Sequence, residues 1–186
     1  MQEYRIKGKE PLWMLIEKQI QHYTDEDFTE ANTLAISKKI AKDLDKTGYN
    51  VSKHGGNWMQ LKTAVKARNR VGRPFIEDFD RAVAALGLDD ITDTYATAMK
   101  IIADLGRDWP SFLASEHRAD VKEIVGNKKI ELMVAKAKAL AGEPGIRYLI
   151  SESFAPQAII EALSVSEDEY KSVKSKVDTE LAEKTR

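Results

Sequence analysis

The chain of 186 residues contains no cysteine, which excludes disulfide bonds, zinc–thiolate centres, iron–sulfur clusters and thiol catalysis. Glycine and proline are scarce, at 10 and 5 residues, so the chain is neither collagen-like nor a low-complexity linker. No apolar run approaches the ~20 residues that cross a bilayer, and the mixed charge of residues 1–10 is unlike a secretion signal. Hydrophobic residues at 42% and charged residues at 32% predict a soluble, cytoplasmic globular protein.

Signatures of the common enzyme classes are also missing. The chain has no Walker motif, no Gly-x-Gly-x-x-Gly, no Gly-x-Ser-x-Gly and no His-Glu-x-x-His. Its three histidines, His22, His54 and His117, lie far apart in the sequence. Catalysis needs acid, base or nucleophilic groups that converge. We therefore predict a non-catalytic protein with no metal site and no cofactor.

Hydrophobic residues recur at helical spacing along nearly the whole chain. Leu12, Ile16 and Ile20 follow one another in steps of four, and similar patterns return after each glycine or proline break. Strand signals are weak, because no Asn-Gly or Asp-Gly hairpin and no sustained alternation occurs. The pattern predicts an all-α fold of about nine helices, in which one helix ends near Gly126 and the next begins at Asn127.

The formal net charge of −1 conceals two parts of opposite sign. Residues 1–73 carry 14 basic and 9 acidic side chains, a net charge of +5, whereas residues 74–186 carry 15 and 21, a net charge of −6. Pro74 interrupts the chain where the sign changes. We predict a basic, DNA-binding three-helix unit over 1–73, and an acidic helical bundle over 74–186 for self-association or for binding another protein.

The basic character is concentrated between Lys53 and Arg73, a stretch with six cations and no acidic residue. Lys62, Lys66 and Arg70 are spaced by four, so they form one row on a helix, which we call the basic row. We predict that the row contacts phosphates and that amide side chains beside it reach base edges. The predicted nucleic-acid-binding residues are Lys53, Asn57, Gln60, Lys62, Lys66, Asn69, Arg70 and Arg73. The amides among them are the base-reading candidates.

An acidic run follows directly and offers another explanation of the basic stretch. It consists of Glu77, Asp78, Asp80, Asp89, Asp90 and Asp93. Ion pairs between exposed side chains are common and individually weak. The basic stretch could therefore dock on residues 77–93 of its own chain instead of on a nucleic acid.

Three stretches in this region follow one another in a recognisable order. They read Ile40-Ala-Lys-Asp-Leu-Asp-Lys-Thr-Gly-Tyr, then Gly55-Gly-Asn-Trp-Met-Gln-Leu-Lys-Thr-Ala-Val, then Arg68-Asn-Arg-Val-Gly-Arg. This order resembles the helix-turn-helix region of large serine recombinases over residues 15–73. The resemblance implies that a three-helix unit is held by Ile40, Ala41, Leu44, Trp58 and Val65, and that Met59–Arg70 lies on DNA. It implies no recombination activity, because the chain shows no recombinase catalytic region.

Two hypotheses about function remain open from the sequence. The first is a regulatory or accessory protein that binds duplex DNA, with about five phosphate contacts and a salt slope of roughly −4.5. The alternative is a helical protein–protein interaction protein with no nucleic-acid role, such as a viral or plasmid assembly factor or an inhibitor of a host enzyme. A third hypothesis combines both: a DNA-packaging or replication accessory subunit with a DNA-binding head and an oligomerising body.

Overall fold

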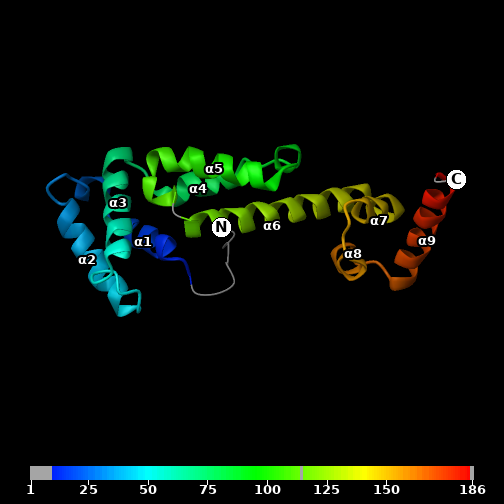
Figure 1. Cartoon of the computed structure of the whole chain (residues 1–186), viewed down its shortest axis with the longest axis horizontal. Coiled ribbons are helices and arrows are strands. Elements are labelled where there is room, and N and C mark those ends of the chain that lie inside the picture. Colours follow the sequence, from blue (N-terminus) through cyan, green and yellow to red (C-terminus); the bar gives the residue numbers. More distant parts are fainter. Residues whose placement is uncertain (1–9, 114, 185–186) are drawn as a thin grey trace. The chain divides into compact units, whose positions relative to one another are not determined.

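The computed structural model describes residues 10–113 and 115–184 (Figure 1). Within them it contains nine α-helices, three short 3₁₀ helices and no strand, which confirms the predicted all-α fold. The α-helices are α1 (Leu12–Ile20), α2 (Thr33–Lys46), α3 (Gly55–Val71), α4 (Phe75–Ala84), α5 (Thr94–Asp108), α6 (Ser115–Leu140), α7 (Gly142–Ser151), α8 (Pro156–Leu163) and α9 (Glu167–Lys184). The 3₁₀ helices are η1 (Asp25–Asp27), η2 (Asp89–Ile91) and η3 (Pro110–Leu113). None of the described helices is both long and apolar enough to span a membrane.

The chain divides into two compact units, and the division lies near residue 126. Unit 1 contains the chain up to Leu86 together with Asp90–Val125, and unit 2 contains Gly87–Asp89 and the chain from Gly126 onwards. The boundary expected between residues 73 and 74 therefore falls inside unit 1. Net charge describes the surface, whereas a domain boundary depends on which apolar side chains pack together, so a change of sign need not mark one.

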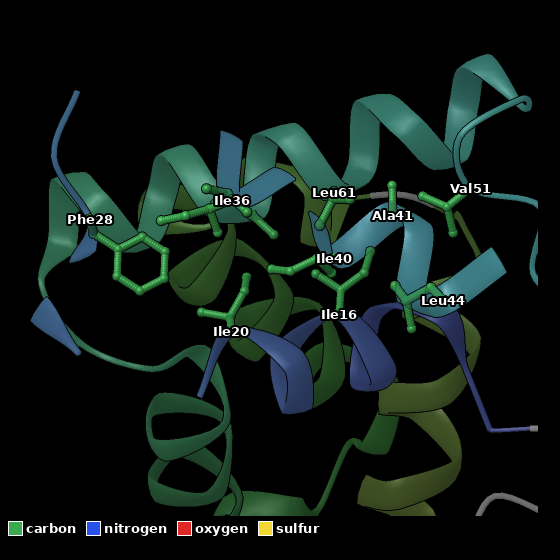
Figure 2. Close-up of a cluster of buried hydrophobic side chains, with 11 residues drawn as sticks. Ile16, Ile20, Phe28, Ile36, Ile40, Ala41, Leu44, Val51 and Leu61 are labelled. Atoms are coloured by element: carbon green, nitrogen blue, oxygen red, sulfur yellow. The ribbon is translucent and has the colours of Figure 1, made fainter. Parts of the chain in front are cut away.

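The first core of unit 1 lies between α1, α2 and α3. Ile16 of α1, Ile40 of α2 and Leu61 of α3 are at most 1% exposed and meet at its centre (Figure 2). On each helix the apolar residues follow one another in steps of three or four, so each helix has one apolar face. Each large aliphatic side chain buried in this way contributes about 2 kcal/mol of transfer free energy. This core fixes α3 against α1 and α2, and α3 carries the basic row.

Aromatic side chains form a second core that joins α1 to α4, η3 and α6. Trp13 of α1 meets Phe75 of α4 edge to face, with ring centroids 5.3 Å apart. Phe112 of η3 lies 4.8 Å from Phe75 and stacks on the imidazole of His117 at 5.2 Å. Such pairs add about 1 kcal/mol each beyond the area they bury. These contacts cross residue 73, which explains why α4 belongs to the same unit as α1–α3.

Helix α6 continues through Gly126, where the glycine signal predicts an end. A Cβ at Gly126 would meet no atom within 4 Å, so no neighbouring group packs closely against this glycine. Its φ is not in the left-handed region either. One glycine inside a helix costs only about 1 kcal/mol, which the burial of Val125 and Met133 on either side offsets. The prediction that a new helix begins at Asn127 is therefore wrong.

Unit 2 has a core of its own, formed by α7, α8, α9 and the C-terminal half of α6. Ile146, Leu149 and Ile159 are fully buried in it. On its surface, Arg147 of α7 bonds both carboxylate oxygens of Glu180 of α9, at 2.9 Å each, and its Nε bonds Glu143 at 2.8 Å. The hydrogen bonds from Lys176 and then from Arg147 lower the pKa of Glu143, and the bonds from Arg147 lower that of Glu180, so the cluster stays ionised and links α7 to α9.

Candidate nucleic-acid interface

Helix α3 carries the basic row, and its two ends are fixed by local interactions. At its N-terminus the Nδ1 atom of His54 accepts a hydrogen bond from the backbone N–H of Asn57, at 3.3 Å. At its C-terminus Gly72 adopts the left-handed conformation, with φ of 74°, which ends the helix. Pro74 then begins the turn into α4. The helix is therefore a defined rod of 17 residues that holds the row at fixed spacing.

The basic row faces solvent. Lys66 and Arg70 are exposed and Lys62 is half-buried, with its ammonium group 5.8 Å from the ring of Trp58. In the described part of the chain no carboxylate forms an ion pair with any of the three. Arg70 donates a hydrogen bond to the carbonyl oxygen of Asp108 at 2.6 Å, which orients the guanidinium group but leaves its charge uncompensated.

The row forms one side of a groove, which we call the α2–α3 groove. It has a volume of about 590 Å³ and lies within unit 1. Its lining residues are Glu30, Thr33, Leu34, Ser37, Met59, Lys62, Thr63, Lys66, Ala67, Arg70 and Pro110. The first turns of α2 and most of the length of α3, from Met59 to Arg70, line the groove, so both helices border it. Glu30 is the one carboxylate on its lining.

The groove lining also holds two exposed apolar side chains, which were not predicted from the sequence and which we call the apolar floor. Leu34 of α2 is 53% exposed and Met59 of α3 is 55% exposed, although both are large hydrophobic side chains. Met59 stands three residues before Lys62, which is a helical neighbour distance and was the available signal. Leu34 could not be connected to the row from the sequence, because it lies on another helix.

Arg73 does not belong to the solvent-facing row. Its Nε atom bonds the two carboxylate oxygens of Asp78 at 2.7 Å, and its Nη2 atom bonds Asp108 at 2.8 Å. Asp78 is buried and also accepts a hydrogen bond from the indole of Trp109, at 3.1 Å. These contacts raise the pKa of the Arg73 guanidinium. The basic stretch therefore does dock on the acidic run, but it does so at Arg73. The bonds of Arg73 to Asp78 and Asp108 connect the end of α3 to α4 and α5.

Arg68, another cation of the basic stretch, is also structural. Its side chain is 6% exposed, and its Nη2 atom bonds Asp25 of η1 at 2.7 Å. The guanidinium group lies 5.3 Å from the ring of Phe28. Arg68 therefore holds the η1 segment against α3, on the opposite side of the helix from the basic row.

Two of the three predicted base-reading amides are engaged inside unit 1. The Nδ2 atom of Asn57 donates to the carbonyl oxygen of Tyr49 at 3.0 Å, and Nε2 of Gln60 lies 2.8 Å from Nε2 of His117. Neither amide is free to read a base edge without losing that bond. Asn69 is half-buried and makes no side-chain hydrogen bond within the described chain, and Lys53 is exposed at the start of α3.

These features define an all-α protein with a basic, apolar-floored groove on its first unit. Comparison with protein-family models, with curated proteins and with solved structures returned no match to the chain. The resemblance to the helix-turn-helix region of large serine recombinases therefore stays a prediction. Ile40, Ala41, Leu44 and Val65 are buried between α1, α2 and α3, as any compact three-helix arrangement of this sequence requires.

Proposed function

We propose that the protein binds nucleic acid through the phosphate backbone, with Lys62, Lys66 and Arg70 as the phosphate contacts. The observation that carries the proposal is a row of three cations, in which Lys66 and Arg70 are exposed and Lys62 is half-buried, and none of which pairs with a carboxylate within residues 10–113 and 115–184. Adjacent cations on a fixed helix repel one another and gain free energy when an anion lies across them. Steps of four residues place them about 6 Å apart along the helix axis.

The strength of this contact is expected to depend on salt. Each neutralised phosphate releases counterions, so three contacts give a slope in log affinity against log salt concentration of about −2.1 on a single strand. On duplex DNA the slope is about −2.7. That slope corresponds to a loss of about 40-fold in affinity between 50 and 200 mM salt. Fluorescence anisotropy with a labelled mixed-sequence DNA pool measures it. A salt-independent affinity would contradict phosphate binding.

Reversing two charges of the row is expected to remove most of the binding. At 0.1 M salt each contact contributes about eightfold, so Lys62→Glu with Lys66→Glu should lower the affinity by about 60-fold or more. The control is Lys100→Glu with Lys138→Glu, which changes the net charge equally at two exposed lysines that lie on other helices and form no ion pair with the described residues. If both double variants lose affinity equally, net charge rather than the row is responsible.

A protein partner is the second candidate, and the exposed side chains of Leu34 and Met59 are the observation that favours it. A cationic groove with an apolar floor also suits an acidic amphipathic helix. Pull-down from lysate with and without nuclease separates the candidates, because partners lost after nuclease treatment were held through nucleic acid. Self-association through residues 74–186 remains a prediction that light scattering tests.

A further inference from the structure

The basic row does not stand on a free ridge. It shares its groove with α2, whose residues Thr33, Leu34 and Ser37 line the side opposite the row, and with Pro110 of η3. Helix α3 is thus flanked by other parts of unit 1 at the level where its cations reach solvent. The site is a groove, and its lining holds both the cations and the exposed apolar side chains of Leu34 and Met59.

A DNA duplex fits this shape poorly. The major groove is about 12 Å wide and admits one helix, which is itself about 10–12 Å across with its side chains. Because α2 lies beside α3 at the groove, α3 cannot enter a major groove alone as a protruding recognition helix does. A duplex could touch the cations with its outer phosphates, but Leu34 and Met59 would remain uncovered beneath it.

A single strand satisfies both parts of the groove. We infer that the α2–α3 groove binds single-stranded nucleic acid, with phosphates on the basic row and an unstacked base on Leu34 and Met59; this rests on the proposed phosphate contact. Single-strand binding elsewhere combines a cationic track with aromatic side chains on which bases stack, and here apolar side chains take the place of the aromatic ones. A methionine thioether makes favourable contacts with aromatic rings and adapts its shape to them.

The charges around the groove agree with this orientation. The cations Lys62, Lys66 and Arg70 lie on the α3 side, whereas Glu30 lies on the α2 side. A carboxylate repels a second phosphate backbone but accepts hydrogen bonds from the exocyclic amino groups of bases. One side of the groove therefore suits a backbone and the other suits bases, as one strand presents them.

The inference is tested with the full chain and three labelled probes at 100 mM salt. The probes are a mixed-sequence 12-nucleotide single strand, the blunt 12-base-pair duplex that contains it, and inorganic polyphosphate of similar charge. We expect the single strand to bind at least about fivefold more tightly than the other two. Leu34→Ser with Met59→Ser should remove this preference and leave the affinity for polyphosphate unchanged.

The control variant is Ile130→Ser with Leu140→Ser, which replaces two exposed aliphatic side chains of unit 2. It should keep the single-strand preference. Equal binding of single strand, duplex and polyphosphate, all lost in Lys62→Glu with Lys66→Glu, would overturn the inference but keep the proposed function. Binding of none of the probes would overturn both and favour an acidic protein partner in the groove.

Discussion

Replacing Glu17 with glutamine is expected to stabilise unit 1 at pH 9 by up to about 5 kcal/mol. Glu17 lies on α1 and is 3% exposed, and burial raises the pKa of its carboxyl group from 4.5 to about 8. The difference of about 3.5 pKa units, at 1.36 kcal/mol each, sets the upper limit. Glutamine keeps an oxygen that can accept the hydrogen bond donated by the backbone N–H of Phe75, which is 3.3 Å from Oε2 of Glu17.

The charges around Glu17 come from α3 and α4 and act in opposite directions. Arg68 of α3 lowers the pKa of Glu17, and Asp78 of α4 raises it, but both effects are smaller than that of burial. Gln60 of α3 and His117 of α6 line the same small cavity as Glu17. Among the described residues Arg68 forms its ion pair with Asp25, at 2.7 Å, and none with Glu17.

The direction of the pH effect follows from proton binding. In the pH range between 4.5 and 8 the folded chain holds a proton on Glu17 that the unfolded chain has released. The stabilisation by Glu17 is therefore complete below pH 4.5, and it is lost as the pH rises through about 8. Above that pH the carboxylate is charged in both states. The glutamine variant has no such loss.

Tryptophan fluorescence isolates this effect, because the three tryptophans, Trp13, Trp58 and Trp109, all lie in unit 1. Urea unfolding of both chains between pH 4.5 and 9 gives the difference in unfolding free energy, in which other titrating groups largely cancel. The exposed carboxylate of Glu77 provides the control, as Glu77→Gln. A stability difference between wild type and Glu17→Gln that does not change with pH would contradict a buried, neutral Glu17.

Much of the local structure was predictable because its causes are local. The spacing of Leu12, Ile16 and Ile20 indicates α1, and Gly72 ends α3 through its left-handed backbone. The four-residue steps of Lys62, Lys66 and Arg70 place them on one face whatever lies around the helix. Such features need only the periodicity and the termination signals of a single helix.

The rest of the site could not be predicted, because it depends on contacts between residues far apart in sequence. Gln60 is held by His117, 57 residues away, and Arg73 is held by Asp108, 35 residues away. The sequence pattern of α3 alone does not indicate that His117 and Asp108 are the partners of Gln60 and Arg73. Likewise Leu34 reaches the groove only because α2 packs against α3. Sequence periodicity identifies the exposed face of α3, whereas tertiary packing decides which polar groups on it remain available.

The tertiary contacts also link the fold to the proposed function. Asp108 accepts a bond from Arg73 through its carboxylate and from Arg70 through its carbonyl oxygen. The end of α5 thus fixes both the end of α3 and the guanidinium group of the last cation in the row. Of the six cations between Lys53 and Arg73, Arg68 and Arg73 are held by carboxylates, which leaves Lys53 and the basic row, and the row alone supplies three phosphate contacts. The expected salt slope on duplex DNA of about −2.7 instead of −4.5 follows directly from this.

Gly145→Ala is expected to destabilise unit 2 by about 3 kcal/mol. Gly145 is buried on α7, and a Cβ there would lie 2.3 Å from the carbonyl oxygen and 3.2 Å from the carbonyl carbon of Ala137 of α6. Both atoms belong to the backbone of a long helix, so they cannot move aside as the end of a side chain can. Relief requires α7 to shift away from α6, which opens the core around Ile146 and Leu149.

The matched substitution Gly126→Ala should have the opposite effect. A Cβ at Gly126 meets nothing within 4 Å, so alanine should stabilise α6 by about 1 kcal/mol through its better helix propensity. Far-UV circular dichroism during urea unfolding should show an early loss of helix for Gly145→Ala, while tryptophan fluorescence, which reports unit 1, keeps its wild-type midpoint. Equal midpoints for both alanine variants by circular dichroism would mean that α6 and α7 do not pack through Ala137 and Gly145.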